Sequence, residues 1–319
     1  MLAKIQSIWQ IILDQVYTSI EKPRLNADEL TKSSWAQPIK SYADVPDVYK
    51  VFFDSFLANG RDFPYTVLTP SYENFIHKTS ERLICDGGCE IIVLEKSGNT
   101  FEPRRYPLDR IIYVEFRTVL LDANFKICGV TGHGVQIAST LKFNSVTDYL
   151  FTPFLKWARL AGLNPTQTVQ SRELEKFDDL YQHSYKFMNY GKRSLLGGEQ
   201  VLHIYLQPEI REPILKFMGK TFSKRISPTH MSILTDRELI LIQEEETRSG
   251  KERYGGIWSY IPLRKILSLS LHEKTDNLLG LTIRLIEDLF LELLYQDSAR
   301  EELNQLLSRF KDITSGVVS

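Results

Sequence analysis

The hydrophobic and polar positions in the last third of the chain alternate in short runs that predict antiparallel strands. Leu239–Ile242 is an apolar run between charged residues, and its length is that of a strand rather than a helix. Thr247–Gly256 is polar and rich in glycine, which predicts a hairpin connection. Leu267, Leu269 and Leu271 then alternate with serines, which predicts a strand with one buried face. More apolar runs follow, so the pattern predicts a meander.

A helix is predicted to close the chain. Its apolar residues recur at the spacing of a single helical stripe, and they are Ala299, Leu303, Leu306, Leu307 and Phe310. Ser298, with Glu301 three residues later, predicts a capping box at the start of this helix.

The same order of patterns occurs in the first half of the chain. Glu90–Leu94 matches Glu238–Ile242, and a polar segment follows each run. Residues 106–111 (YPLDRI) match residues 261–266 (IPLRKI), an offset of 261 − 106 = 155 residues. Strands and then a helix follow in both halves, and the apolar stripe of the first-half helix is Leu150, Phe154, Trp157, Ala158 and Ala161. This order predicts one small β-rich module that occurs twice.

Successive antiparallel strands that end in one amphipathic helix resemble the pleckstrin-homology-like domains of bacteria and the related GRAM domains. The residues that carry the resemblance are Leu234–Arg237 and the Ile261–Ile266 step between two strands. In those families a C-terminal helix plugs one open end of a strongly bent sheet. The resemblance implies an α+β fold with two pleckstrin-homology-like domains, each a barrel-like antiparallel sheet closed by a C-terminal helix, together with N-terminal and linker helices.

The predicted domain boundaries follow from these repeats. We expect an N-terminal helical segment and connector at residues 1–62, a first domain at 63–163, a linker with a helix at 164–198, and a second domain at 199–319. The length of 319 residues also favours two domains over one.

Helices are also predicted outside the repeats. Asp47–Leu57 is expected to turn Val48, Val51, Phe52 and Phe56 inward, and Leu174 to Met188 is expected to form the linker helix. Ser145 with Asp148 is expected to cap the helix that ends the first repeat.

The first 20 residues form a predicted helix with a long apolar stripe. Lys4 is the one cation on its polar face, whereas an interfacial membrane helix carries many Lys and Arg residues there. The stripe is therefore expected to dock on its own domain or on a partner subunit. The candidate partner-binding residues are Leu2, Ile5, Trp9, Ile12 and Val16.

The composition of the chain limits the classes of protein to which it can belong. The net charge of −1 argues against a nucleic-acid binder that depends on global electrostatics. Three cysteines cannot all pair, which favours a reducing, cytoplasmic setting. No apolar run approaches the roughly 18 residues of a membrane span. We therefore expect a cytoplasmic protein without a transmembrane segment, with a peripheral position at the membrane as an alternative.

One basic cluster is a candidate binding site. Lys216, Lys220, Lys224 and Arg225 are interleaved with Phe217, Met218 and Phe222 and have no acidic residue among them. The resemblance implies that such a cluster near the first strands can hold inositol phosphates or anionic lipid headgroups. The alternative is a solvated loop that keeps its charges in water.

Signals for catalysis and metal binding are weak. Cys85 and Cys89 flank a Gly-Gly turn, but no second pair of ligands completes a zinc site, so they are expected to be structural. The glycines around His133 lack the spacing of a phosphate loop and are better explained by a hairpin turn. No nucleophile motif accompanies the histidines. We therefore expect no metal, no cofactor and no enzymatic activity.

The resulting expectation is a non-catalytic binding or adaptor protein that engages a protein partner or an anionic membrane surface. The alternative is a homo-oligomeric assembly component that associates through edge strands or through the N-terminal stripe. An enzyme with an unfamiliar site is the third hypothesis.

Overall fold

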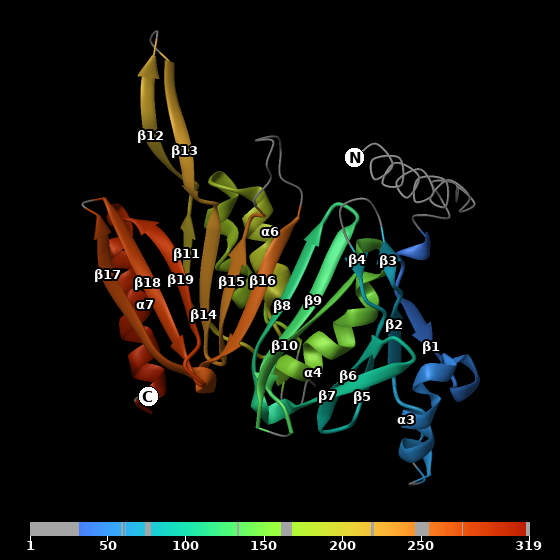
Figure 1. Cartoon of the computed structure of the whole chain (residues 1–319). Helices are drawn as coiled ribbons and strands as arrows, with labels where there is room; N and C mark the ends of the chain where they lie inside the picture. The colour runs from blue at the N-terminus through green and yellow to red at the C-terminus, as the bar shows by residue number, and fades with distance from the viewer. Residues whose placement is uncertain are drawn as a thin grey trace, which may run out of the picture.

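The computed structural model describes residues 32–58, 60, 62–73, 78–132, 134–160, 168–217, 220–245, 255–275 and 277–316. Within these ranges, only the backbone is described for residues 72–73, 78, 214–217 and 220–222. The described residues form an α+β structure made mostly of antiparallel sheets with few helices, as the sequence pattern predicts (Figure 1).

The first half of the chain contributes a five-stranded sheet in the order β1-β2-β5-β6-β7. Its strands are β1 (Gln37–Ile39), β2 (Thr66–Thr69), β5 (Arg82–Asp86), β6 (Glu90–Ser97) and β7 (Thr100–Pro107). A short hairpin of β3 (Tyr72–Glu73) and β4 (Lys78–Thr79) lies between β2 and β5 in the chain. Helix α3 (Asp47–Leu57) packs Tyr49, Phe52 and Phe53 against one face of this sheet.

A seven-stranded sheet contains strands from both halves. The first half supplies β8 (Ile111–Val119), β9 (Asp122–Val130) and β10 (Gln136–Asn144), and the second half supplies β11 (Val201–Gln207), β14 (His230–Thr235), β15 (Glu238–Gln243) and β16 (Gly256–Pro262). The strand order is β10-β9-β8-β16-β15-β14-β11. The halves meet where β8 pairs with β16 in antiparallel orientation, with Phe116 opposite Trp258.

The rest of the second half forms a smaller sheet and a projecting hairpin. The three-stranded sheet consists of β17 (Ile266–Thr275), β18 (Leu278–Leu285) and β19 (Phe290–Gln296). Helix α7 (Arg300–Thr314) covers it and buries Leu303, Leu306 and Phe310. Strands β12 (Ile210–Phe217) and β13 (Lys220–Ser227) pair with each other and extend away from the body, which we call the β12–β13 hairpin (Figure 1).

The remaining helical elements are short. The 3₁₀ turns are η1 (Tyr42–Asp44), η2 (Leu108–Arg110), η3 (Ser145–Phe151), η4 (Asp178–Gln182), η5 (Leu263–Lys265) and η6 (Asp297–Ala299). Helix α4 (Thr152–Leu160) ends the described part of the first half, and α5 (Ser171–Glu175) and α6 (Tyr185–Ser194) lie in the connection between the halves. The predicted linker helix is thus divided into α5, η4 and α6.

The order of elements in residues 66–160 recurs in residues 201–314, which we call the first and second repeats. Each runs through a strand, a hairpin, three strands, a 3₁₀ turn, three strands, a second 3₁₀ turn and a helix. The registers also agree, because Glu90 lies opposite Pro107 and Glu238 lies opposite Pro262. A β-bulge follows residue 111 in β8 and residue 266 in β17, again 266 − 111 = 155 residues apart.

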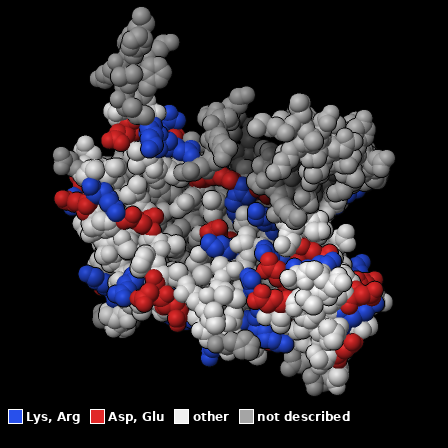
Figure 2. Space-filling view, in the orientation of Figure 1, with Lys and Arg blue, Asp and Glu red and all other residues white. Residues whose placement is uncertain are grey.

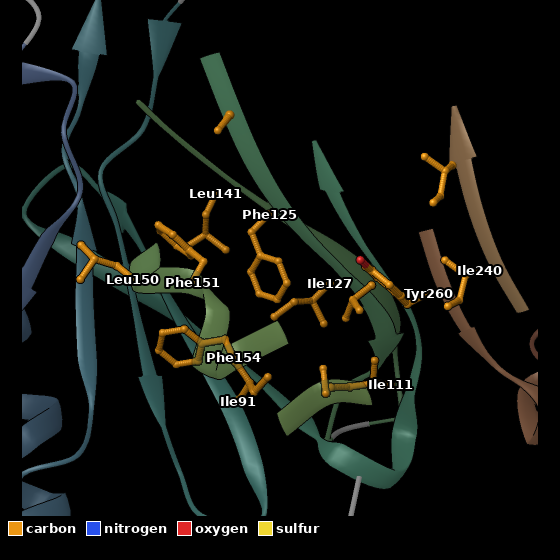
Figure 3. Packing of buried hydrophobic residues seen from close by; sticks show 14 of the residues in the cluster. Ile91, Ile111, Phe125, Ile127, Leu141, Leu150, Phe151, Phe154, Ile240 and Tyr260 are labelled. Carbon is orange, nitrogen blue, oxygen red and sulfur yellow. The ribbon is translucent and has the colours of Figure 1, made fainter. Parts of the chain in front are cut away.

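The two repeats pack around a common interior. One buried cluster joins Ile91, Phe125 and Phe154 of the first repeat to Ile240 and Tyr260 of the second (Figure 3). A second cluster lies mainly under α7 in the second repeat, and a third lies between α3 and the five-stranded sheet. The repeats therefore fold as parts of one body.

The expectation of barrel-like sheets is wrong, because the sheets stay open. Closing the first repeat through β8 would require a free edge on that strand. Strand β8 already pairs with β9 on one side and β16 on the other, so both its edges are in use. Strand β16 likewise lies between β15 and β8.

Several local expectations also fail for identifiable reasons. The capping box at Ser298 is absent because that residue lies in η6, and α7 begins two residues later, at Arg300, with no side-chain cap. Asn144, rather than Ser145, caps η3 by accepting from the Val146 amide. Leu267 is 56% exposed because the β-bulge in β17 turns it out of the buried face.

In α3, Phe52 is buried as expected, but Val51 is 65% exposed. Tyr49 and Phe53 take the inward positions instead, so the buried stripe is rotated from the predicted one.

Candidate functional site

A buried polar cluster ties the two repeats together beside the β8–β16 junction. Arg159, on α4 of the first repeat, donates from Nε to Glu238 Oε1 of β15 at 3.0 Å. A terminal nitrogen of the same guanidinium donates to the Ser194 carbonyl at 2.7 Å and lies 3.7 Å from Glu199 Oε2. The charged carbon also lies 3.8 Å from the centre of the Tyr260 ring, a cation–π geometry.

The cluster holds two carboxyl groups around one cation in a buried environment. The side chains of Arg159, Glu199 and Glu238 are 5%, 0% and 3% exposed. Burial, together with the charge of Glu238, raises the pKa of Glu199 to about 8. Burial opposes the charge of Arg159, but Glu238 keeps its pKa above the usual value. The cluster is closed to solvent, so it serves to join the repeats rather than to receive a ligand.

A cleft of about 300 Å³ lies between the edge strand β11 and helix α7. Lys176 Nζ donates to the Val201 carbonyl at 2.6 Å, and Arg309 donates to the Leu202 carbonyl. Burial first, and then the charge of Arg309, lowers the pKa of His203 in this cleft to about 4. The two cations are thus engaged with the backbone of β11, and they cover its outer edge.

The predicted basic cluster lies on the β12–β13 hairpin. The pairing places Lys216 opposite Thr221, Phe217 opposite Lys220 and Glu212 opposite Lys224. For Lys216 and Lys220 the structure describes the backbone but not the side chains.

Arg225 stands at the base of the hairpin, where its side chain is 16% exposed and its Nε lies 3.9 Å from Glu209 Oε1. Arg211 approaches the same carboxylate at 3.2 Å. Figure 2 shows lysine and arginine side chains gathered at this base beside acidic ones. The hairpin therefore brings the predicted basic residues onto one projecting element, with its base partly neutralised.

Other predicted site residues are not brought into a cluster. The candidate partner-binding residues Leu2, Ile5, Trp9, Ile12 and Val16 lie outside the described residues. Cys85 is buried in β5, where burial raises the pKa of its thiol, and Cys89 is exposed in the turn before β6. Across the ranges that the structure describes, no three His, Cys, Asp or Glu side chains are placed to hold a metal ion.

The Arg159 cluster is the feature that sequence reasoning missed. Glu238 is the counterpart of Glu90 in the internal sequence match. Charged residues at strand ends are usually solvated, so the sequence does not indicate that Glu238 is buried. No helix in the described part of the chain has the length and apolar character needed to cross a membrane.

Comparison with protein-family models and with curated proteins finds no match to this sequence.

Proposed function

We propose that the chain is a non-catalytic binding protein made of two pleckstrin-homology-like repeats that present the β12–β13 hairpin to an anionic membrane surface. The kinship is supported by the repeated order of elements and by the terminal helix of each repeat, which packs on the sheets. The repeats share a sheet, so the hairpin projects from a body to which both repeats contribute.

The observation that carries the proposal is the charge of the projecting hairpin. Residues 210–227 contain five basic residues and one acidic residue, a net charge of 5 − 1 = +4 in a chain of net charge −1. The rest of the chain therefore carries a net charge of −5, so the hairpin has a net charge opposite in sign to that of the other residues. Each Lys or Arg near an anionic leaflet contributes on the order of 1 kcal/mol of attraction.

The geometry of the hairpin suits a surface contact. Its strands pair only with each other among the described residues, and it extends from the body, so a flat surface can reach it (Figure 1). Phe217 and Lys220 form its last described pair, so both an apolar and a basic residue stand at its outer end. An apolar residue beside a basic one suits the boundary of a membrane, where the apolar side chain meets acyl chains and the basic one meets anionic headgroups.

Co-sedimentation with vesicles tests the proposal. The full chain is expected to bind phosphatidylcholine vesicles that contain phosphatidylserine, and to bind pure phosphatidylcholine vesicles far less. Added salt should weaken the binding because exposed charges are screened. The double variant Lys220→Glu/Lys224→Glu should bind at least ten-fold more weakly.

The matched control is Lys142→Glu/Lys156→Glu, which makes the same charge change at exposed positions on β10 and α4. This control should bind the anionic vesicles nearly as well as the parent. Equal loss in both variants, or equal binding to neutral vesicles, would contradict a role for the hairpin.

A further inference from the structure

Strand β8 of the first repeat has its outer edge filled by a strand from elsewhere in the chain. Residues Val114–Thr118 pair with Gly256–Tyr260 of β16, in antiparallel register. Main-chain hydrogen bonds supply the contact, and alternate side chains supply the packing, as in recognition by strand addition. The pairing of β16 with β8 thus shows which kind of strand the outer edge of β8 binds.

Strand β17 is the counterpart of β8 in the second repeat. Both strands follow a Pro-initiated 3₁₀ turn, and both carry a β-bulge after their first residue. By the 155-residue offset, Leu269–Glu273 occupy the positions of Val114–Thr118. Within the described ranges, β17 pairs with β18 on one side and with no strand on the other. The position that β16 fills on β8 is therefore open on β17.

A second copy of the chain is a poor candidate to fill this position in the same way. The counterpart of β16 is β7, and Pro103 stands at the position of Trp258 (258 − 103 = 155). The Gly132 amide donates to the Arg105 carbonyl at 3.2 Å, so Arg105 points its carbonyl away from β6. Pro103 is two residues away and faces the same side, where it has no N–H to donate. The outer edge of β7 is thus closed.

The edge strand β11 is covered as well. Lys176 and Arg309 occupy carbonyls on the outer side of β11. Natural sheets commonly block exposed edges with charged side chains and prolines. The middle of β17 has no charged residue and no proline, because residues 268–271 are Ser-Leu-Ser-Leu. Its nearest charged residues, Glu273 and Lys274, stand at the far end of the strand, where Glu273 meets Arg300 at 2.8 Å.

We propose that β17 is a docking edge for an extended segment of another protein, which adds as an antiparallel strand along Leu269–Glu273. In the first repeat, Trp258 lies opposite Phe116 and Tyr260 lies opposite Val114. The segment therefore carries large apolar or aromatic side chains two residues apart, opposite Leu271 and Leu269. Leu269 is buried and Leu271 is half-buried, so an apolar surface is in place at these positions.

A peptide with the sequence of residues 256–261, Gly-Ile-Trp-Ser-Tyr-Ile, is the probe. It is titrated into the full chain, and amide exchange is followed by NMR. At saturation, the amides of Leu269, Leu271 and Glu273 are expected to exchange at least ten-fold more slowly. The same peptide, methylated on the backbone nitrogen of its Trp, loses the hydrogen bond that Pro103 cannot make and should leave these rates unchanged.

Substitutions locate the site independently. Leu271→Lys should weaken binding of the peptide at least ten-fold, whereas Phe290→Lys, on the exposed opposite edge strand β19, should not. Three results overturn the proposal: no slowing at β17 with saturating peptide, equal slowing with the methylated peptide, or β17 amides already protected in a dimer of the free chain. This docking edge is separate from the β12–β13 hairpin, so failure at the vesicle surface leaves it untouched.

Discussion

Arg159 at the end of α4 and Glu238 at the start of β15 form a buried ion pair that crosses from one repeat to the other. Arg159 belongs to α4 of the first repeat and Glu238 to β15 of the second, so the ion pair holds the two repeats against each other. The strand edges differ between the repeats, because β8 is paired on both sides whereas β17 is paired with β18 alone among the described strands.

Removing the cation from this pair should destabilise the whole chain. Arg159→Met leaves Glu199 and Glu238 buried without their partner, and losing one member of a buried pair costs about 3 to 5 kcal/mol. Urea unfolding monitored by circular dichroism measures the change. Arg284→Met is the matched control, because its pair with Asp288 is exposed and is worth about 1 kcal/mol or less. Similar costs for the two variants would contradict a joining role for Arg159.

The raised pKa of Glu199 predicts a specific dependence of stability on pH. The folded state holds this proton up to a pKa of about 8, whereas the unfolded state releases it near 4.5. The folded state therefore binds more protons between these values, and its stability falls as the pH rises from about 4.5 to 8. Glu199→Gln carries no such proton and should become progressively more stable than the parent across this window. A constant difference from pH 5 to 8.5 in urea unfolding would refute the assignment.

Buried His230 should stay neutral at pH values well below the usual pKa of histidine. Burial lowers its pKa to about 4, and a contact of 3.0 Å between Nδ1 and the Pro228 carbonyl offsets part of this effect. The sign is opposite to that of Glu199, because the stability that His230 contributes is present above pH 6.5 and is lost as the pH falls through about 4. NMR titration of the imidazole resonances checks this expectation, and a midpoint between 6 and 7 would contradict it.

Gly255 is predicted to be essential to the junction of the repeats. Its φ is +93°, and a Cβ at this position would lie 1.9 Å from the Thr118 carbonyl oxygen of β8. Gly255→Ala should therefore cost more than about 2 kcal/mol, since both the conformation and the backbone contact are lost. Gly98→Ala is the control, with φ of +61° and no atom within 4 Å, and should cost only about 1 to 2 kcal/mol. Denaturant unfolding of the two variants separates the clash from the strain.

Much of the local structure could be predicted because it depends on short-range patterns. Asp47–Leu57 is helical over the predicted range, and the matched steps at 106–111 and 261–266 each contain a strand end, a 3₁₀ turn and a strand start. Proline fixes φ at the same point of both steps, with values of −53° at Pro107 and −58° at Pro262.

The long-range arrangement could not be predicted, because pairing partners leave no local signal. Nothing in the pattern of β16 indicates that it joins β8, and this contact keeps the sheets open. The β-bulge that exposes Leu267 also shifts the alternation within a strand that was otherwise correctly placed. Nothing in the local pattern marks Arg159 or Glu238 as a buried partner, because only their tertiary neighbours bury them.

Amide hydrogen exchange on the free chain measures whether the two repeats share one plan, with β16 filling an edge of β8 that stays open on β17. Val114, Phe116 and Thr118 face β16 and should exchange slowly, whereas their counterparts Leu269, Leu271 and Glu273 should exchange at least ten-fold faster. Equal protection of the two sets, or faster exchange in the first set, would contradict the account.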